Sequence, residues 1–168
     1  MAKLQSSILI SLFLLQLAFP IITANLPPKD IEIVVEGTVH CQSCDTRGMW
    51  SLTGAKPIAN AAISVICKDH RNRVMFYKPF KTNDDGYFYA ALVGFKITNP
   101  LLDHPLQTCR VKLVSSPLEE CSMLTNVNYG LNGAPLRYEE KRIVGEHYEA
   151  VIYAAGPLAF RPNECTPN

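Results

Sequence analysis

The stretch that decides the fold is IEIVVEGTVHCQSC, residues 31–44. Two sets of residues alternate along it, the apolar set Ile31, Ile33, Val35 and Val39 and the polar set Glu32, Glu36 and Thr38. Strict alternation puts the two sets on opposite faces and predicts a half-buried β-strand. The strand leads directly into Cys41 and Cys44. The segment therefore ends in two closely spaced cysteines, which could form disulfides, bind a metal or act as a redox pair.

Cysteine usage points to structural bridges. The chain has six cysteines, Cys41, Cys44, Cys67, Cys109, Cys121 and Cys165. An even number in a chain bound for an oxidising compartment predicts three disulfides. The spacing of Cys41 and Cys44 also suits half of a zinc site or a thioredoxin-like redox pair. A zinc site would need a second close pair of ligands. A redox pair would need a helix beginning at the cysteines, but residues 45–48 are typical of a turn. Disulfides are favoured, with no metal and no cofactor.

Further strands follow the first. Short apolar or alternating runs occupy residues 61–67, 74–77, 87–92, 110–114 and 148–154. Turn residues separate them, which predicts an all-β sandwich or barrel with little helix. The Asn83-Asp84-Asp85-Gly86 segment is the strongest hairpin-type turn, 116–123 can form one helical turn, and 95–109 and 125–142 read as long loops.

Alternation also orients two of the cysteines. Cys67 continues the side of Ile63 and Val65, and Cys109 continues the side of Val111. Both sulfurs therefore point inward, and we expect a buried bridge between two strands.

The N-terminal residues 1–24 have the features of a secretory signal peptide, with Lys3, an apolar core over 8–19 and a cleavage site at 22–24. The apolar run falls short of the ~20 residues of a membrane span, which argues against a stable membrane anchor. We expect residues 25–168 to form one secreted domain of the extracellular space or cell wall. Without Lys3 the chain has 15 basic and 15 acidic side chains, and this balance does not favour nucleic acid as a partner.

Four separated motifs carry a family resemblance. They are Gly37-x-Val39-x-Cys41-x-x-Cys44, residues 54–58 ahead of Cys67, the 85–88 turn and the closing segment 153–165. Together they resemble the olive-pollen major allergen (Ole e I) and extensin-like family. The closing segment is similar to the cysteine-containing domain of proline-rich and non-classical arabinogalactan proteins.

This resemblance implies a plant cell-wall protein with a seven-stranded antiparallel barrel or sandwich. It also implies that the cysteines join first to fifth, second to sixth and third to fourth. The implied bridges are Cys41–Cys121, Cys44–Cys165 and Cys67–Cys109. Chimeric members carry a Pro- and His-rich arm before the domain, whereas only Pro27-Pro28 is seen here, so wall cross-linking through an arm is not expected.

Catalytic groups do not gather in the sequence. His40, His70, His104 and His147 are scattered. Asp103-His104 is the only adjacent acid–base pair, and no nucleophile motif accompanies it. We therefore expect that the protein is not an enzyme.

A basic cluster is the candidate binding site. The candidate polysaccharide-binding residues are Lys68, His70, Arg71, Arg73 and Tyr77. Cations beside an aromatic ring suit acidic pectin, while aromatic faces alone suit neutral galactan; the alternative is an ordinary solvated turn. The sequence thus predicts a non-catalytic module whose partner is a cell-wall polysaccharide or wall glycoprotein. The competing hypothesis is a secreted protein-interaction or signalling module of the pollen-allergen type.

The single tryptophan, Trp50, follows the Cys-x-x-Cys turn. It is placed either to stack on a sugar or to cover the neighbouring disulfides. We expect it to cover them, because a large aromatic near bridges in a small domain commonly fills core volume.

Overall fold

Strands make up most of the regular structure. The computed structural model describes residues 30–97, 99, 102–146 and 148–165, so the expected signal peptide (1–24) and Pro27-Pro28 lie outside the described residues. Seven strands are five residues or longer: β1 (Asp30–Cys41), β3 (Ala62–Lys68), β4 (Val74–Lys81), β5 (Tyr87–Ala91), β6 (Cys109–Ser115), β9 (Arg137–Val144) and β10 (Tyr148–Arg161). Three two-residue strands accompany them: β2 (Lys56–Pro57), β7 (Met123–Leu124) and β8 (Ala134–Pro135).

Helix content is low, as predicted. The helical segments are α2 (Pro105–Thr108) and the 3₁₀ turns η1 (Cys44–Thr46), η2 (Glu119–Cys121) and η3 (Val127–Tyr129). The turn expected within 116–123 is η2. Across the described part of the chain, every helix is too short or too polar to cross a bilayer.

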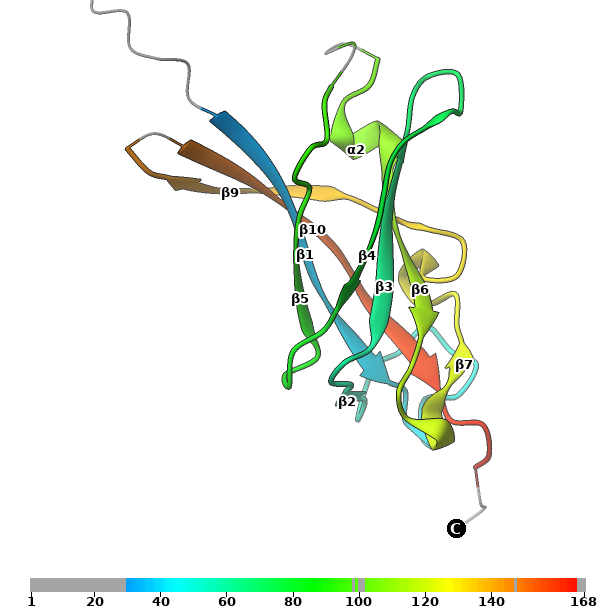
Figure 1. Ribbon diagram of the computed structural model, residues 1–168. Coiled ribbons are helices and arrows are strands. Elements are labelled where there is room, and N and C mark those ends of the chain that lie inside the picture. The colour runs from blue at the N-terminus through cyan, green and yellow to red at the C-terminus, as the bar shows by residue number, and fades with distance from the viewer. Residues whose placement is uncertain (1–29, 98, 100–101, 147, 166–168) are drawn as a thin grey trace, which may run out of the picture.

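The strands form two sheets that enclose one main core. One sheet has the order β2-β1-β10-β7, with β5 added on β1 and β9 on β10, and the other has the order β4-β3-β6-β8. In Figure 1, β3, β4 and β6 cross in front of the diagonal pair β1 and β10. Val39 and Phe160 of the first sheet and Val65 and Val111 of the second belong to the same buried cluster. The all-β sandwich is confirmed.

Of the two predicted architectures, the sandwich forms, because the sheets do not close into a barrel. One detail differs: the fold is not wholly antiparallel, because β1 and β10 pair in parallel from Asp30–Tyr148 to Cys41–Phe160. Alternation specifies which face a residue occupies but is silent on strand direction. A strand from the start of the domain and one from its end share no hairpin that would force them to run antiparallel.

Strand β9 was not predicted. Its first six residues lie within the 125–142 stretch that was expected to be a loop, and all of its residues are exposed. Its backbone pairs with β10, and charged residues are typical of such edge strands. Ile31, expected to face inward, is 66% exposed at the start of β1.

The Asn83–Gly86 turn forms as predicted but connects the two sheets. Asn83 Oδ1 accepts hydrogen bonds from the backbone nitrogens of Asp85 (3.1 Å) and Tyr87 (2.9 Å), and Gly86 has φ +70°. It leads from β4 in one sheet to β5 in the other. It is therefore a crossover turn rather than the loop of a paired hairpin.

Gly37 in the opening motif is required by close packing. A Cβ at this position would collide with the carbonyl oxygen of Ala155 and lie 2.7 Å from the ring of Phe88. The register of β1 against β10 also shifts between Gly37 and Val39. A glycine permits this close approach of the two strands.

The three disulfides have the pairing that the family resemblance implies, namely Cys41–Cys121, Cys44–Cys165 and Cys67–Cys109. Cys67 and Cys109 face each other across β3 and β6 and are fully buried, as the alternation predicted. The other two bridges tie η2 and the C-terminal tail to the segment at the end of β1.

Candidate functional site

The basic turn between β3 and β4 is organised by an acidic residue. Asp69 is buried and accepts hydrogen bonds from the backbone nitrogens of Arg71 (2.8 Å) and Arg73 (2.9 Å) and from Arg73 Nε (2.7 Å). Burial alone raises the pKa of Asp69, but the hydrogen bonds from Arg73 and Arg71 outweigh it and hold the pKa below its usual value. The charge of Arg73 is thus paired with Asp69 in its own turn, whereas the sequence predicted Arg73 as a binding residue.

A second buried acid holds the same turn from a distant loop. Asp103 Oδ1 accepts a hydrogen bond from the backbone nitrogen of His70 at 3.1 Å and lies 3.2 Å from His70 Nδ1. The neighbouring His104 instead caps α2, where its Nδ1 accepts from the backbone nitrogen of Leu106. Of the adjacent pair, Asp103 thus contacts His70, and His104 caps the start of α2. His147 lies outside the described residues.

The basic candidates do not all share one surface. An open hollow of about 320 Å³ is lined by Lys68, Asp69, His70, Asn72, Leu102, Gln107, Thr108 and Arg110. Of the five candidate polysaccharide-binding residues, Lys68 and His70 belong to the lining of this hollow. Tyr77 is 60% exposed farther along β4. The structure thus brings Lys68 and His70 together in one hollow, while Tyr77 lies outside the lining of that hollow.

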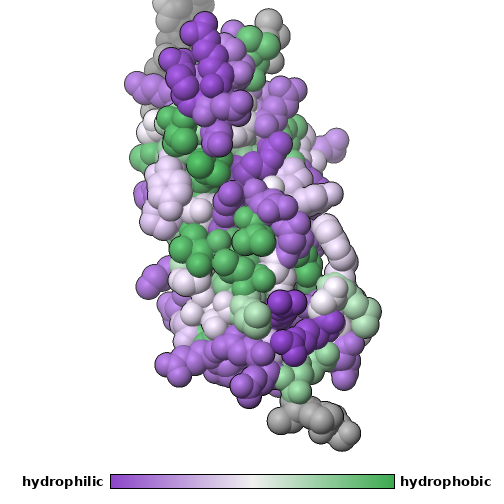
Figure 2. Space-filling view, turned by 90° about the vertical axis from the view of Figure 1, so that its right-hand side faces the viewer, coloured by the Kyte–Doolittle hydropathy of each residue, from purple (hydrophilic) through white to green (hydrophobic). Residues whose placement is uncertain are grey.

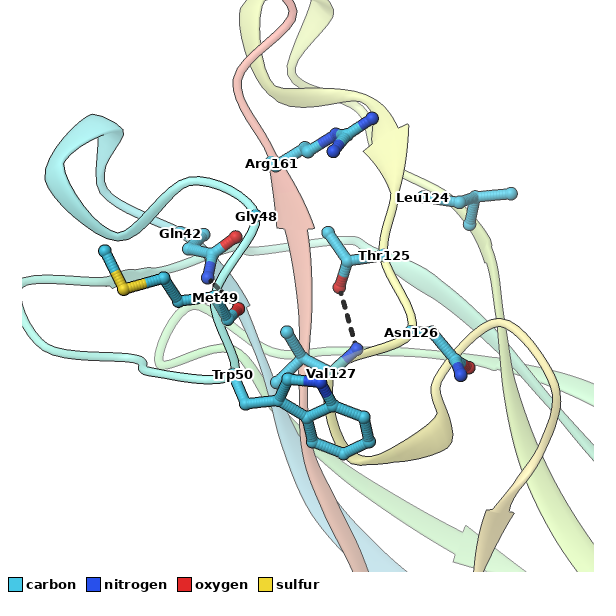
Figure 3. A pocket seen from close by; sticks show the side chains of 9 residues that line it. All are labelled: Gln42, Gly48, Met49, Trp50, Leu124, Thr125, Asn126, Val127 and Arg161. Carbon is cyan, nitrogen blue, oxygen red and sulfur yellow. Dashed lines mark hydrogen bonds between the residues drawn. The ribbon is translucent and has the colours of Figure 1, made fainter.

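A second hollow, of about 200 Å³, lies at the opposite end of the molecule, near the end of β10 (Figures 1 and 3). It is lined by Gln42, Gly48, Met49, Trp50, Leu124, Thr125, Asn126, Val127 and Arg161. The Cys41–Cys121 and Cys44–Cys165 bridges hold the segments that contribute these residues. In Figure 3 the Trp50 ring lies at the edge of the hollow in front of Val127.

Trp50 is not the disulfide cover that was expected. It is 59% exposed and packs against Tyr129, which is 51% exposed. The ring centroids are 5.5 Å apart with an interplanar angle of 78°. The loop after Cys44 carries the indole outward, so two aromatic rings form an accessible corner next to the hollow.

Neither region has the groups of a metal centre. In the described ranges, no three His, Cys, Asp or Glu side chains are grouped so as to hold a metal ion. Figure 2 shows the face on the right of Figure 1, where apolar groups are interrupted by hydrophilic ones.

Comparisons with known proteins agree with the motifs. No family model matches the chain. It is 30% identical over 134 residues to non-classical arabinogalactan protein 30 of Arabidopsis thaliana, covering 77% of this chain and 53% of that protein. It is 29% identical over 142 residues to the pistil-specific extensin-like protein of Nicotiana tabacum, covering 80% of this chain and 31% of that protein. The chain thus spans about half or less of these relatives.

A pollen allergen connects sequence and fold. The chain is 27% identical over 96 residues to major pollen allergen Pla l 1 of Plantago lanceolata, covering 57% of this chain and 65% of the allergen. The crystal structure of the plantain allergen Pla l 1 superposes with a TM-score of 0.58 at 22% identity, covering 82% of this chain and 98% of the allergen chain. The chain is thus a homologue of an arabinogalactan protein and of the pollen allergen Pla l 1, the kinds of protein that the pollen Ole e I allergen and extensin-like family contains, and it shares the sandwich fold of Pla l 1.

Proposed function

We propose that the protein is a secreted, non-catalytic module that binds polysaccharide of the plant cell wall, with pectin or galactan as the ligand class. Its relatives include an arabinogalactan protein and an extensin-like protein. Three disulfides suit an oxidising extracellular compartment. Residues 25–168 would act as the binding domain.

The observation that carries this proposal is the exposed corner of Trp50 and Tyr129 beside the hollow. Trp50 is the only tryptophan in the sequence, and an exposed aromatic ring stabilises the fold less than a buried one. An aromatic side chain offers a large apolar face and loses little conformational entropy when a ligand binds to it. A sugar ring presents C–H groups to such a face and hydroxyl groups to the polar atoms around it.

A glycan array tests the proposal. The purified protein with its disulfides formed is applied to neutral galactans and acidic pectins at several salt concentrations. We expect binding of at least one wall polysaccharide, and loss of that binding in Trp50→Ala. Tyr77→Ala, which removes an equally exposed aromatic beside the basic turn, tells the two candidate surfaces apart.

Absence of binding to every wall glycan at low salt would reject this function. The secreted protein-interaction module, favoured by the similarity to a pollen allergen, would then become the better hypothesis. Binding that survives Trp50→Ala but is lost in Arg71→Gln would retain the function and move it to the basic turn.

A further inference from the structure

The hollow beside Trp50 contains two polar atoms that the described part of the protein leaves unpaired. Gln42 Oε1 and Arg161 Nε are buried without a hydrogen-bond partner, and both residues line the hollow. They come together because β1 and β10 run in parallel up to Cys41 and Phe160. The backbone nitrogen of Gln42 then donates to the Phe160 carbonyl at 2.9 Å.

The orientation of the Gln42 amide is determined by its neighbours. Gln42 is 1% exposed, and its Nε2 donates to the carbonyl oxygens of Met49 (2.8 Å) and Ser51 (2.9 Å). Both partners are acceptors, so the NH₂ group must face them and the oxygen must point away. A buried acceptor without a donor is unfavourable. A hydroxyl group of a ligand in the hollow would supply that donor.

Arg161 gives the hollow a positive charge. It is the only charged side chain in the described lining, and no ion pair is found for it among the described residues. A guanidinium group presents several N–H donors in a planar fork, which matches the two oxygens of a carboxylate. The hollow therefore favours a ligand that carries both a hydroxyl and a carboxylate.

Size and rim chemistry restrict the ligand further. About 200 Å³ is less than the roughly 300–1,000 Å³ of sites for drug-sized molecules. One sugar ring suits such a space better than a long oligosaccharide. The corner of Trp50 and Tyr129 adds an aromatic surface for the apolar face of the ring or of its neighbour in a chain.

We infer that this hollow binds one uronic acid unit of an acidic polysaccharide. The carboxylate pairs with Arg161, a ring hydroxyl donates to Gln42 Oε1, and the apolar face of the sugar lies against Trp50. This assignment rests on the proposed function, because it names the sugar class and the subsite for polysaccharide binding. The basic turn between β3 and β4 is not part of this uronic acid site.

Calorimetric titration with a short oligogalacturonide and with its fully methyl-esterified form tests the assignment. We expect the acidic oligomer to bind at least about tenfold more tightly than the ester, which has lost the charge that Arg161 would pair. Arg161→Gln should weaken acidic binding by about tenfold or more, and Arg161→Lys should weaken it less. Trp50→Ala should weaken both oligomers.

Arg137→Gln is the matched control, because it removes the same charge from an exposed position on β9. Its affinity should stay within about twofold of the unmodified protein, since exposed charges contribute little. Equal binding of acid and ester, or unchanged binding in a folded Arg161→Gln variant, would overturn the uronic acid site while wall-polysaccharide binding remained. Failure of the unmodified protein to bind any wall glycan would instead reject the proposed function.

Discussion

The buried bridge between β3 and β6 allows a quantitative prediction. Cys67 and Cys109 are separated by 42 residues in the sequence. The chain-entropy relation then gives a stabilisation of about 4 kcal/mol at 25 °C from restricting the unfolded chain. Both cysteines are fully buried, so replacing them with alanine also removes packed sulfur atoms, which adds about 1 kcal/mol. The double variant Cys67→Ala/Cys109→Ala should therefore lose about 5 kcal/mol.

The bridge to the C-terminal tail provides a comparison. Cys44 and Cys165 are 121 residues apart, and the same relation gives about 5 kcal/mol. However, without this bridge the last residues can fray in the folded protein and regain part of that entropy. Cys44 is also exposed, so little packing is lost. We expect Cys44→Ala/Cys165→Ala to lose less stability than the buried pair, despite its longer loop.

Urea unfolding at 25 °C, under non-reducing conditions and followed by far-UV circular dichroism, measures both variants against the unmodified protein. The free energy of unfolding should fall further for the buried pair, and the m-value of both variants should rise, because the denatured state loses a cross-link and exposes more surface. A loss below about 2 kcal/mol for Cys67→Ala/Cys109→Ala would refute the reasoning. So would a clearly larger loss for the tail bridge.

Three further predictions follow from single contacts. Asp103→Asn should lower the free energy of unfolding by about 1–3 kcal/mol, because a buried charged acceptor for His70 is lost; an unchanged thermal melt would argue against this role. Partial burial by itself raises the pKa of Glu36, but hydrogen bonds from Lys141 and Tyr87 outweigh it, so the pKa is lowered. The ionised Glu36 carboxylate therefore stabilises the fold above about pH 4, and this stabilisation is lost as the pH falls through the folded-state pKa. Glu36→Gln should thus destabilise the protein more at pH 7 than in acid, with the difference shrinking as the pH is lowered, and melting curves with equal losses at every pH would contradict the assignment. Gly37→Ala should cost about 3 kcal/mol in urea unfolding through its clash with β10, and a loss under about 1 kcal/mol would mean that the strands can separate to admit a methyl group.

Local patterns predicted the strands that have one buried face. The alternation around Cys67 and Cys109 correctly placed both sulfurs inward, because β3 and β6 each have a core side that apolar residues must fill. Strand β9 escaped prediction because no side of it is buried, so its sequence carries no period-two signal. Its strand conformation comes from backbone pairing with β10.

The candidate sites were predicted less well than the fold. The basic turn was found by its charge, but its two organising acids were not. Asp69 had a local signal, since an aspartate at the start of a turn commonly accepts from backbone nitrogens two to four residues ahead. Asp103 had none, because it lies 33 residues from His70 in the sequence. Trp50 was judged by its nearness to cysteines in sequence, whereas its loop carries the ring outward.

The sequence by itself determined the fold class and the family motifs, because alternation, turn residues and cysteine spacing act over short stretches of chain. Only the tertiary structure decided that β1 runs parallel to β10, and with it the meeting of Gln42 and Arg161 in one hollow. Strand direction and the pairing of distant residues depend on how the sheets pack, and no local pattern encodes them. The physical reason is that residues distant in the sequence determine whether a polar atom finds a hydrogen-bond partner and whether an aromatic ring is buried.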